Sequence, residues 1–262
     1  MTRTVQQLFD LSGKTALVTG GSRGLGLQLA QALGEAGAKV LLSSRKASDL
    51  EQAVATLQDQ GIDARWIAAD CAKEADIQRL TDETLERMGD IDILVNNAGA
   101  TWGAPAEDYP LEAWDKVMNL NVRGYFLLSQ AVGKRSMIGR KTGSIINLAS
   151  VAGLGGNPIE MKTIAYNTSK AAVINFTRAL AAEWGHHGIR VNAICPGFFP
   201  SKMSAGLLEV MGQKILQGTP LGRLGDDEGL KGLTLLFASE AGKHITGQFM
   251  AVDGGASALI GG

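Results

Sequence analysis

Short apolar runs alternate with helix-like segments along nearly the whole chain. Runs that predict strands cover residues 14–19, 39–43, 64–68, 91–95, 144–148, 190–194 and 248–252. Segments that predict helices cover residues 27–38, 47–60, 73–88, 111–137, 163–185 and 226–239. Because apolar strands need cover on both faces, this alternation favours parallel strands with helices on either side. The sequence therefore predicts an α/β fold with one doubly wound parallel sheet of about seven strands.

Nothing in the sequence divides the chain into separate units. The 262 residues contain no repeat, low-complexity tract or break in composition. Residues 198–218 are an irregular, partly helical insert rich in Phe, Met and Leu. Because open α/β sheets often use this length for one core, we expect residues 1–262 to form a single domain.

The charge balance is unfavourable for polyanionic partners. Lys and Arg number 25 and Asp and Glu number 26, which leaves a net charge of -1 and no long basic block. Binding to nucleic acid or to a membrane surface is therefore not expected. The N-terminus lacks an apolar segment of signal-peptide length, so we expect a cytoplasmic protein. Cys71 and Cys195 lack nearby Cys or His, which predicts buried thiols and no metal site.

The first strand ends in a glycine-rich turn. The sequence TGGSRGLG, residues 19–26, follows the strand and opens the first helix. There, backbone N–H groups and the helix dipole can hold a pyrophosphate. The spacing differs from GxGxxG, and a tight turn without a ligand is the alternative. The predicted coenzyme contacts in this turn are Gly20, Ser22, Arg23, Gly24, Leu25 and Gly26.

The second strand ends without an acidic residue. A carboxylate at this place would accept a hydrogen bond from the 2′-hydroxyl of an adenosine ribose. The sequence instead has Ser44 and Arg45, and Arg23 lies in the glycine turn. Two guanidinium groups suit a 2′-phosphate, which predicts NADP(H) rather than NAD. A solvated pair of cations on a loop is the alternative.

Tyr166 and Lys170 are four residues apart at the start of a predicted helix, and Ser150 follows a predicted strand. The i and i+4 spacing puts the hydroxyl and the ammonium on one helix face. A free tyrosine has a pKa of about 10, and a neighbouring cation favours its phenolate, which suits proton transfer. Ser150 can hydrogen-bond the substrate oxygen. By itself, YxxxK is also compatible with an ordinary helix.

Small and amide-rich residues follow the fourth predicted strand. Residues 96–99 read Asn-Asn-Ala-Gly, and small side chains there let the backbone approach a ligand. Asn121 falls among apolar positions of the next helix, where Asn is a modest helix former. Asn121 either kinks the helix and binds a water or satisfies its neighbours, and the sequence leaves both open.

Taken together, these motifs resemble the short-chain dehydrogenase/reductase family, in its single-domain branch. The likeness runs from about residue 14 to residue 255. It rests on the glycine turn, Asp70, residues 96–99, the tetrad of Asn121, Ser150, Tyr166 and Lys170, Pro196-Gly197 and residues 252–255. The resemblance implies a Rossmann-type fold and a nicotinamide coenzyme.

The resemblance also implies roles for individual residues. Tyr166 would be the general acid in reduction, Ser150 would polarise the carbonyl, and Asn121 would support a water in a proton relay. Lys170 would lower the tyrosine pKa and hold the nicotinamide ribose. The implied coenzyme contacts beyond the glycine turn are Ser44, Arg45, Asp70, Cys71, Asn97, Ala98, Gly99, Tyr166, Lys170, Pro196, Gly197, Phe199 and Ser201.

This chain departs from the family pattern at two places. The interval between Ser150 and Tyr166 is a few residues longer than is common, with the extra residues in segment 157–162. Ser201 stands where the family usually has Thr, and it keeps the hydroxyl. We therefore expect one side of the substrate pocket to be reshaped.

The expected activity is NADPH-dependent reduction of an apolar ketone, such as a 3-oxoacyl thioester. The expected pocket is lined by Trp102, residues 153–164 and residues 198–211, which carry few charges. The chain looks most like 3-oxoacyl thioester reductases of the rhamnolipid-pathway type. Gluconate 5-dehydrogenases are the group that it resembles next most. Lys141 and His187 stand where reductases that take carrier-protein substrates generally have arginines, which disfavours such a substrate.

Two further expectations concern turnover and assembly. A nucleotide-binding regulator without turnover is a third possibility, but such a protein would be expected to lose Tyr166 or Lys170. The expected partners are a small-molecule substrate and copies of the chain itself. The resemblance implies a homotetramer, with helices 111–137 and 163–185 at one interface and residues 256–262 along another.

Overall fold

The strands form one parallel sheet. The computed structural model describes residues 2–202 and 204–259. Its strands are β1 (Thr15–Thr19), β2 (Lys39–Ser44), β3 (Ala64–Ala68), β4 (Ile93–Asn96), β5 (Gly143–Leu148), β6 (Ile189–Pro196) and β7 (Phe249–Val252). Their order is β3-β2-β1-β4-β5-β6-β7, and every pair is parallel. The predicted doubly wound sheet is confirmed. The strand order reverses between β1 and β4, and ligands bind at such points.

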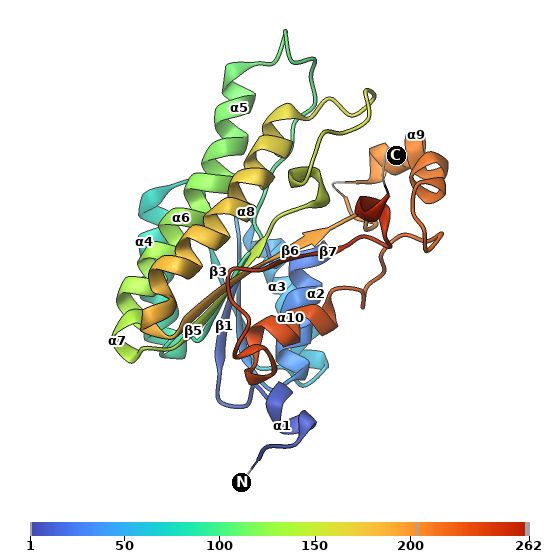
Figure 1. Cartoon of the computed structure of the whole chain (residues 1–262). Coiled ribbons are helices and arrows are strands. Elements are labelled where there is room, and N and C mark those ends of the chain that lie inside the picture. The colour runs from blue at the N-terminus through green and yellow to red at the C-terminus, as the bar shows by residue number, and fades with distance from the viewer. Residues whose placement is uncertain (1, 203, 260–262) are drawn as a thin grey trace.

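Helices cover both faces of this sheet (Figure 1). The α-helices are α1 (Val5–Phe9), α2 (Gly24–Glu35), α3 (Ala47–Asp59), α4 (Glu74–Met88), α5 (Leu111–Met118), α6 (Gly124–Val132), α7 (Ile138–Arg140), α8 (Ile164–Trp184), α9 (Ala205–Gln217) and α10 (Lys231–Ala238). α2, α3 and α10 pack on one face, and α4, α6 and α8 pack on the other. None of the described helices is long and apolar enough to cross a bilayer.

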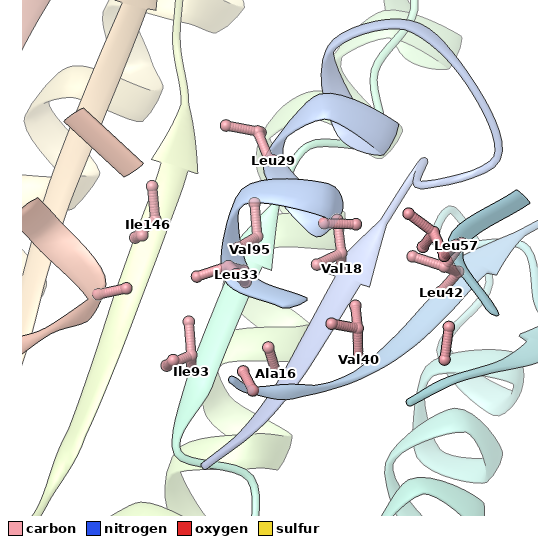
Figure 2. Close-up of a cluster of buried hydrophobic side chains, with 14 of the residues drawn as sticks. Ala16, Val18, Leu29, Leu33, Val40, Leu42, Leu57, Ile93, Val95 and Ile146 are labelled. Carbon is pink, nitrogen blue, oxygen red and sulfur yellow. The ribbon is translucent and has the colours of Figure 1, made fainter. Parts of the chain in front are cut away.

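Successive strand residues supply two separate cores. In β1, Ala16 and Val18 belong to the core beneath α2 and α3, whereas Leu17 belongs to the core beneath α4 and α6. Figure 2 shows the first core, in which Leu29 and Leu33 of α2 lie over the strands. Burying each such leucine stabilises the fold by about 1.5–3 kcal/mol. Because both faces of the sheet are buried in this way, the strands are mostly apolar.

Three elements differ from the sequence prediction. The N-terminal helix α1 was not predicted, because it is only five residues long, buries none of them fully and depends on a capping box between Thr4 and Gln7. α10 begins at Lys231 rather than at residue 226, since Asp226 accepts a bond from the Glu228 N–H in a turn. The long helix predicted at residues 111–137 contains π-helical segments, η1 (Asn119–Arg123) and η2 (Gly133–Met137).

Candidate functional site

The predicted catalytic residues meet at the carboxyl ends of β4 and β5 and on the first turns of α8. Ser150 ends the segment after β5 and caps the 3-10 turn η3 (Val151–Gly153). Gly153 in that turn lies against α8, where a Cβ would come within 2.6 Å of the Lys170 carbonyl carbon. Only glycine allows this approach. The contact sets Ser150 opposite the helix face that carries Tyr166.

Lys170 is buried at the bottom of this site, with 4% of its surface exposed. Its Nζ donates a hydrogen bond of 2.6 Å to the Leu148 carbonyl and lies 5.6 Å from the centre of the Tyr166 ring. The Tyr125 hydroxyl donates to the same carbonyl at 3.3 Å. Burial lowers the pKa of Lys170 from 10.5 to about 8, because the charged form loses solvation.

The expected lowering of the Tyr166 pKa is not observed. Burial raises the pKa of Tyr166 above its usual value, and a hydrogen bond with the Ser150 hydroxyl opposes this only in part. Lys170 directs its hydrogen bond to Leu148 rather than to the phenol. Desolvation therefore outweighs the neighbouring cation. A raised pKa keeps Tyr166 protonated near pH 7, which is the form that a proton donor needs.

Asn121 connects the end of β4 to α8. Its side chain is fully buried in the π-helical segment η1, and its hydrogen bonds satisfy neighbouring groups, which was one of the two alternatives. Its Oδ1 accepts from the Ala100 N–H at 2.8 Å, and its Nδ2 donates to the Ala100 carbonyl and to Ser169 Oγ, both at 2.9 Å. Ser169 in turn donates to the Tyr166 carbonyl at 2.7 Å. The Asn121 side chain therefore fixes α8 beside the strand ends.

The glycine turn is held by Thr19 and Asn97. Asn97 Nδ2 donates to the carbonyls of Thr19 and Gly20 at 2.9 and 3.1 Å, and Thr19 Oγ1 accepts from the Asn97 N–H at 3.1 Å. A Cβ at Gly26 would lie 2.3 Å from the Gly20 carbonyl oxygen, so the turn closes only with glycine there. Asn97 thus supports the shape of the turn.

This turn fits a pyrophosphate. Gly20 and Gly24 have φ of 64° and 54°, which bends the chain sharply into α2. The N-cap residue Arg23 makes no side-chain cap, so the first N–H groups of α2 can receive an anion. Ser22, Leu25 and Gly26 lie in the same turn and helix start.

The predicted 2′-phosphate contacts lie at the end of β2. Ser44 ends β2 and Arg45 is exposed just beyond it. Arg23 is engaged, because its Nη1 lies 3.4 Å from Asp49 Oδ2 in the first turn of α3. The two guanidinium groups therefore share this corner with one carboxylate.

The other predicted coenzyme residues lie at the ends of β3, β4 and β6. The Asp70 carboxylate accepts from the Ala72 N–H at 3.1 Å, while Cys71 is buried and burial raises its pKa to about 12. Ala98 donates its N–H to Thr19 Oγ1 at 3.2 Å. A Cβ at Gly99 would lie 3.4 Å from Asn121 Oδ1.

Beyond β6, the chain turns over the site. A Cβ at Gly197, which follows Pro196, would lie 2.6 Å from Asp253 Cβ. Phe199 is buried against Gly225, so only its backbone is available to a ligand. Ser201 Oγ lies 3.0 Å from Ser204 Oγ. The buried state expected for Cys195, at the end of β6, is confirmed.

The cavity at the N-terminal end of α8 differs from the expected pocket, and its lining includes none of the predicted catalytic residues. It measures about 470 Å³ and is lined by residues 104–107, Gly156, Asn157, Ile159, residues 161–164 and Asn167. The predicted segment 153–164 supplies much of its wall, but Trp102 and residues 198–211 do not line it. The Ala104 N–H donates to the Lys162 carbonyl at 2.9 Å and draws these two loops together.

Sequence reasoning missed three residues that support the site. Thr19 and Ser169 lie inside the recognised motifs, but their bonding partners are distant along the chain. Tyr125 lies on α6, and its ring centre is 5.6 Å from Lys170 Nζ. No local pattern marks Tyr125, because its contact depends on how α6 and α8 pack.

Comparisons with known proteins agree with this geometry. The family model for short chain dehydrogenases matches residues 14–211. A galactitol 2-dehydrogenase of Rhizobium johnstonii is 42% identical over 254 residues, which cover 95% of this chain and 97% of the relative. A rhamnolipids biosynthesis 3-oxoacyl-(acyl-carrier-protein) reductase of Pseudomonas aeruginosa is 40% identical over 256 residues, covering 94% and 97%.

A solved structure is also similar along its full length. The gluconate 5-dehydrogenase of Burkholderia cenocepacia, in complex with NADP and tartrate, has a TM-score of 0.93 and 34% identity, with 98% of this chain and 100% of that chain covered. The family match and the similarity in sequence and structure thus extend over most of the chain. The chain belongs to the short-chain dehydrogenase/reductase family.

Proposed function

We propose that the protein is an NADP(H)-dependent carbonyl reductase whose substrate is a 3-oxoacyl thioester or a similar apolar ketone. The observation that carries this proposal is the placement of Ser150, Tyr166 and Lys170 at the carboxyl end of the sheet, with the glycine turn at the switch point beside them. We further infer that the whole chain acts as one coenzyme-binding catalytic domain. A cytoplasmic location remains a prediction.

The proposed chemistry is acid catalysis of hydride transfer. When bound, NADPH supplies the hydride that adds to the carbonyl carbon. Tyr166 donates its phenolic proton to the carbonyl oxygen, and Ser150 holds that oxygen by a hydrogen bond. Lys170, with its pKa lowered to about 8, is still mainly charged at pH 7 and stabilises the phenolate that remains. Asn121 keeps α8 in place.

The coenzyme preference rests on charge and on one solved relative. The Burkholderia enzyme was solved with NADP. A carboxylate at the end of β2 would repel a 2′-phosphate, but this chain has Ser44 there. Arg23 and Arg45 supply positive charge. The glycine turn opens α2 without a side-chain cap on its first N–H groups, which suits a pyrophosphate. Together these features support NADP(H).

The substrate class rests on the cavity lining. Ala104, Pro105, Ala106, Met161 and Ile164 are apolar, which favours an acyl chain, whereas Ile159 is 84% exposed. Glu107 and Lys162 also line the cavity and give it two charges. A sugar-acid or polyol oxidoreductase is the second candidate, and the names of the Rhizobium and Burkholderia proteins favour it. A nucleotide-binding regulator is disfavoured, because the predicted tetrad is complete.

A substrate panel tests these alternatives. We expect NADPH oxidation with 3-oxoacyl esters, with kcat/KM rising along a series of increasing acyl length as apolar surface is buried. Activity with 5-ketogluconate should be lower, and NADH should replace NADPH poorly. Faster turnover of 5-ketogluconate or of galactitol would favour the sugar reading. Tight NADPH binding without turnover of any compound would favour the regulator.

The proposed assembly is a homotetramer. On the outer layer, Phe126 of α6 is 46% exposed and stacks edge-on against Phe176 of α8, which leaves apolar surface available for a second copy. The proposed second interface includes residues 256–259, while residues 260–262 lie outside the described residues. Light scattering should therefore give about four times the mass of one chain, and a monomer would contradict the assignment.

A further inference from the structure

The insertion between Ser150 and Tyr166 is anchored at its base by a polar cluster. Asn157 Nδ2 donates to Thr163 Oγ1 at 2.9 Å and to Asn167 Oδ1 at 3.0 Å. Thr163 Oγ1 also donates to Asn167 Oδ1 at 2.9 Å. These bonds join both ends of the segment to the first turn of α8. The insertion is thus a fixed wall next to Tyr166.

The same segment is also tied to the loop after β4. Lys162 accepts a backbone hydrogen bond of 2.9 Å from Ala104. Residues on both sides of this bond line the 470 Å³ cavity. The insertion is therefore bonded both to the start of α8 and to the loop after β4. Its outermost side chains, including Ile159 and Glu160, face solvent.

Helix α9 lies across from this wall and is loosely attached. Within α9 only Met211 and Ile215 are buried, and Figure 1 shows the helix outside the two helical layers. The segment leading into it reaches the glycine turn, since a Cβ at Gly24 would lie 3.9 Å from Ser201 Cβ. α9 thus belongs to a segment that starts beside the glycine turn.

One ion pair joins α9 to the insertion. Lys214 Nζ of α9 donates to Glu160 Oε1 of the insertion at 2.7 Å, and this bond holds the pKa of Glu160 below its usual value. The partners are 54 residues apart and both are largely exposed. The pair joins the insertion, which leads into the helix that carries Tyr166, to the weakly packed helix α9.

We propose that Glu160 and Lys214 are positioning residues that hold α9 against the insertion and so set the affinity for substrate. The proposal rests on the proposed function, because it assigns α9 to one side of the substrate site. In this role the two residues position α9 and take no direct part in the chemistry. Their loss should therefore raise KM for the ketone and leave kcat and NADPH affinity nearly unchanged.

Charge reversal and exchange test the pair. Lys214→Glu and Glu160→Lys should each raise KM about two- to five-fold, the range expected for an exposed ion pair. The double variant Glu160→Lys/Lys214→Glu should restore KM, because the pair is rebuilt with opposite sign. High salt should raise KM of the wild type and have little effect on Glu160→Gln. Unchanged KM in both single variants, or no restoration in the double variant, would overturn the proposal.

A matched control and an independent readout separate this role from general stability. Lys231 Nζ of α10 contacts Glu35 Oε1 of α2 at 2.8 Å, another pair that joins two elements. Lys231→Glu should leave KM unchanged. Amide hydrogen exchange should be faster in residues 205–217 of Lys214→Glu than in the wild type, with or without substrate. This measurement tests the ion pair even if the protein reduces no ketone in the panel. Failure to reduce any ketone would reject the proposed function and not the role of the ion pair.

Discussion

Replacing Tyr166 with Phe is expected to lower kcat/KM for ketone reduction by about a thousand-fold or more, while NADPH binds nearly as in the wild type. Loss of a positioned general acid typically costs 10²–10⁴-fold. The hydroxyl is the only group that Phe lacks, so packing in the half-buried site should persist. Steady-state kinetics and titration of NADPH fluorescence would measure the two effects separately.

A second tyrosine provides the control for this experiment. The chain has three tyrosines, and Tyr109 donates its hydroxyl to the Trp102 carbonyl at 3.2 Å in an exposed loop. Tyr109→Phe should keep kcat within about two-fold of the wild type, since exposed substitutions rarely change function or stability. Turnover by Tyr166→Phe near the wild-type rate would refute the acid role of Tyr166.

Replacing Lys170 with Met is expected to make the protein more stable at pH 7 and nearly inactive. Burial lowers the pKa of Lys170 from 10.5 to about 8. This shift means that the charged form costs the folded state about 3 kcal/mol. Methionine fills a similar volume without a charge, although the Leu148 carbonyl loses a hydrogen bond worth about 1 kcal/mol. The free energy of unfolding should therefore rise by about 1–2 kcal/mol.

The pH dependence of this gain distinguishes it from better packing. Below pH 8 the folded protein carries the buried charge, and the full cost is present. Between pH 8 and about 10.5 the folded state has lost this proton and the unfolded state has kept it, so wild-type stability from this group rises with pH. Urea denaturation should therefore show that the advantage of Lys170→Met shrinks from pH 7 to pH 10. An exposed control, Lys243→Met, should show no such trend. A variant less stable than the wild type at pH 7 would contradict the expectation.

Much of the fold could be predicted because its signals are local. β1 and β2 are continuous apolar runs, and the helix α3 begins at Ala47 as its pattern predicted. Strand pairing follows from the alternation of strands and helices, since parallel neighbours need a crossover. The exceptions are also instructive: α1 has only five residues, none of them fully buried, and its capping box alone was too weak a signal.

The sequence predicted the relative placement of the candidate site residues, but their physical state only in part. The spacing of Tyr166 and Lys170 placed both on one helix face, as observed. It also suggested that the lysine lowers the tyrosine pKa, whereas burial raises it. Burial depends on every element packed around α8, and a spacing of four residues carries no information about that environment.

The sequence by itself determined the parallel sheet, the glycine turn and the two groups on α8, because these follow from periodicity and spacing between near neighbours. Only the tertiary structure decided that Lys170 bonds Leu148, that Asn121 joins Ala100 to Ser169, and that Glu160 meets Lys214. In each case the partners come from segments distant along the chain. Hydrogen-bond partners and desolvation are properties of the packed structure, so they arise only once those segments have come together.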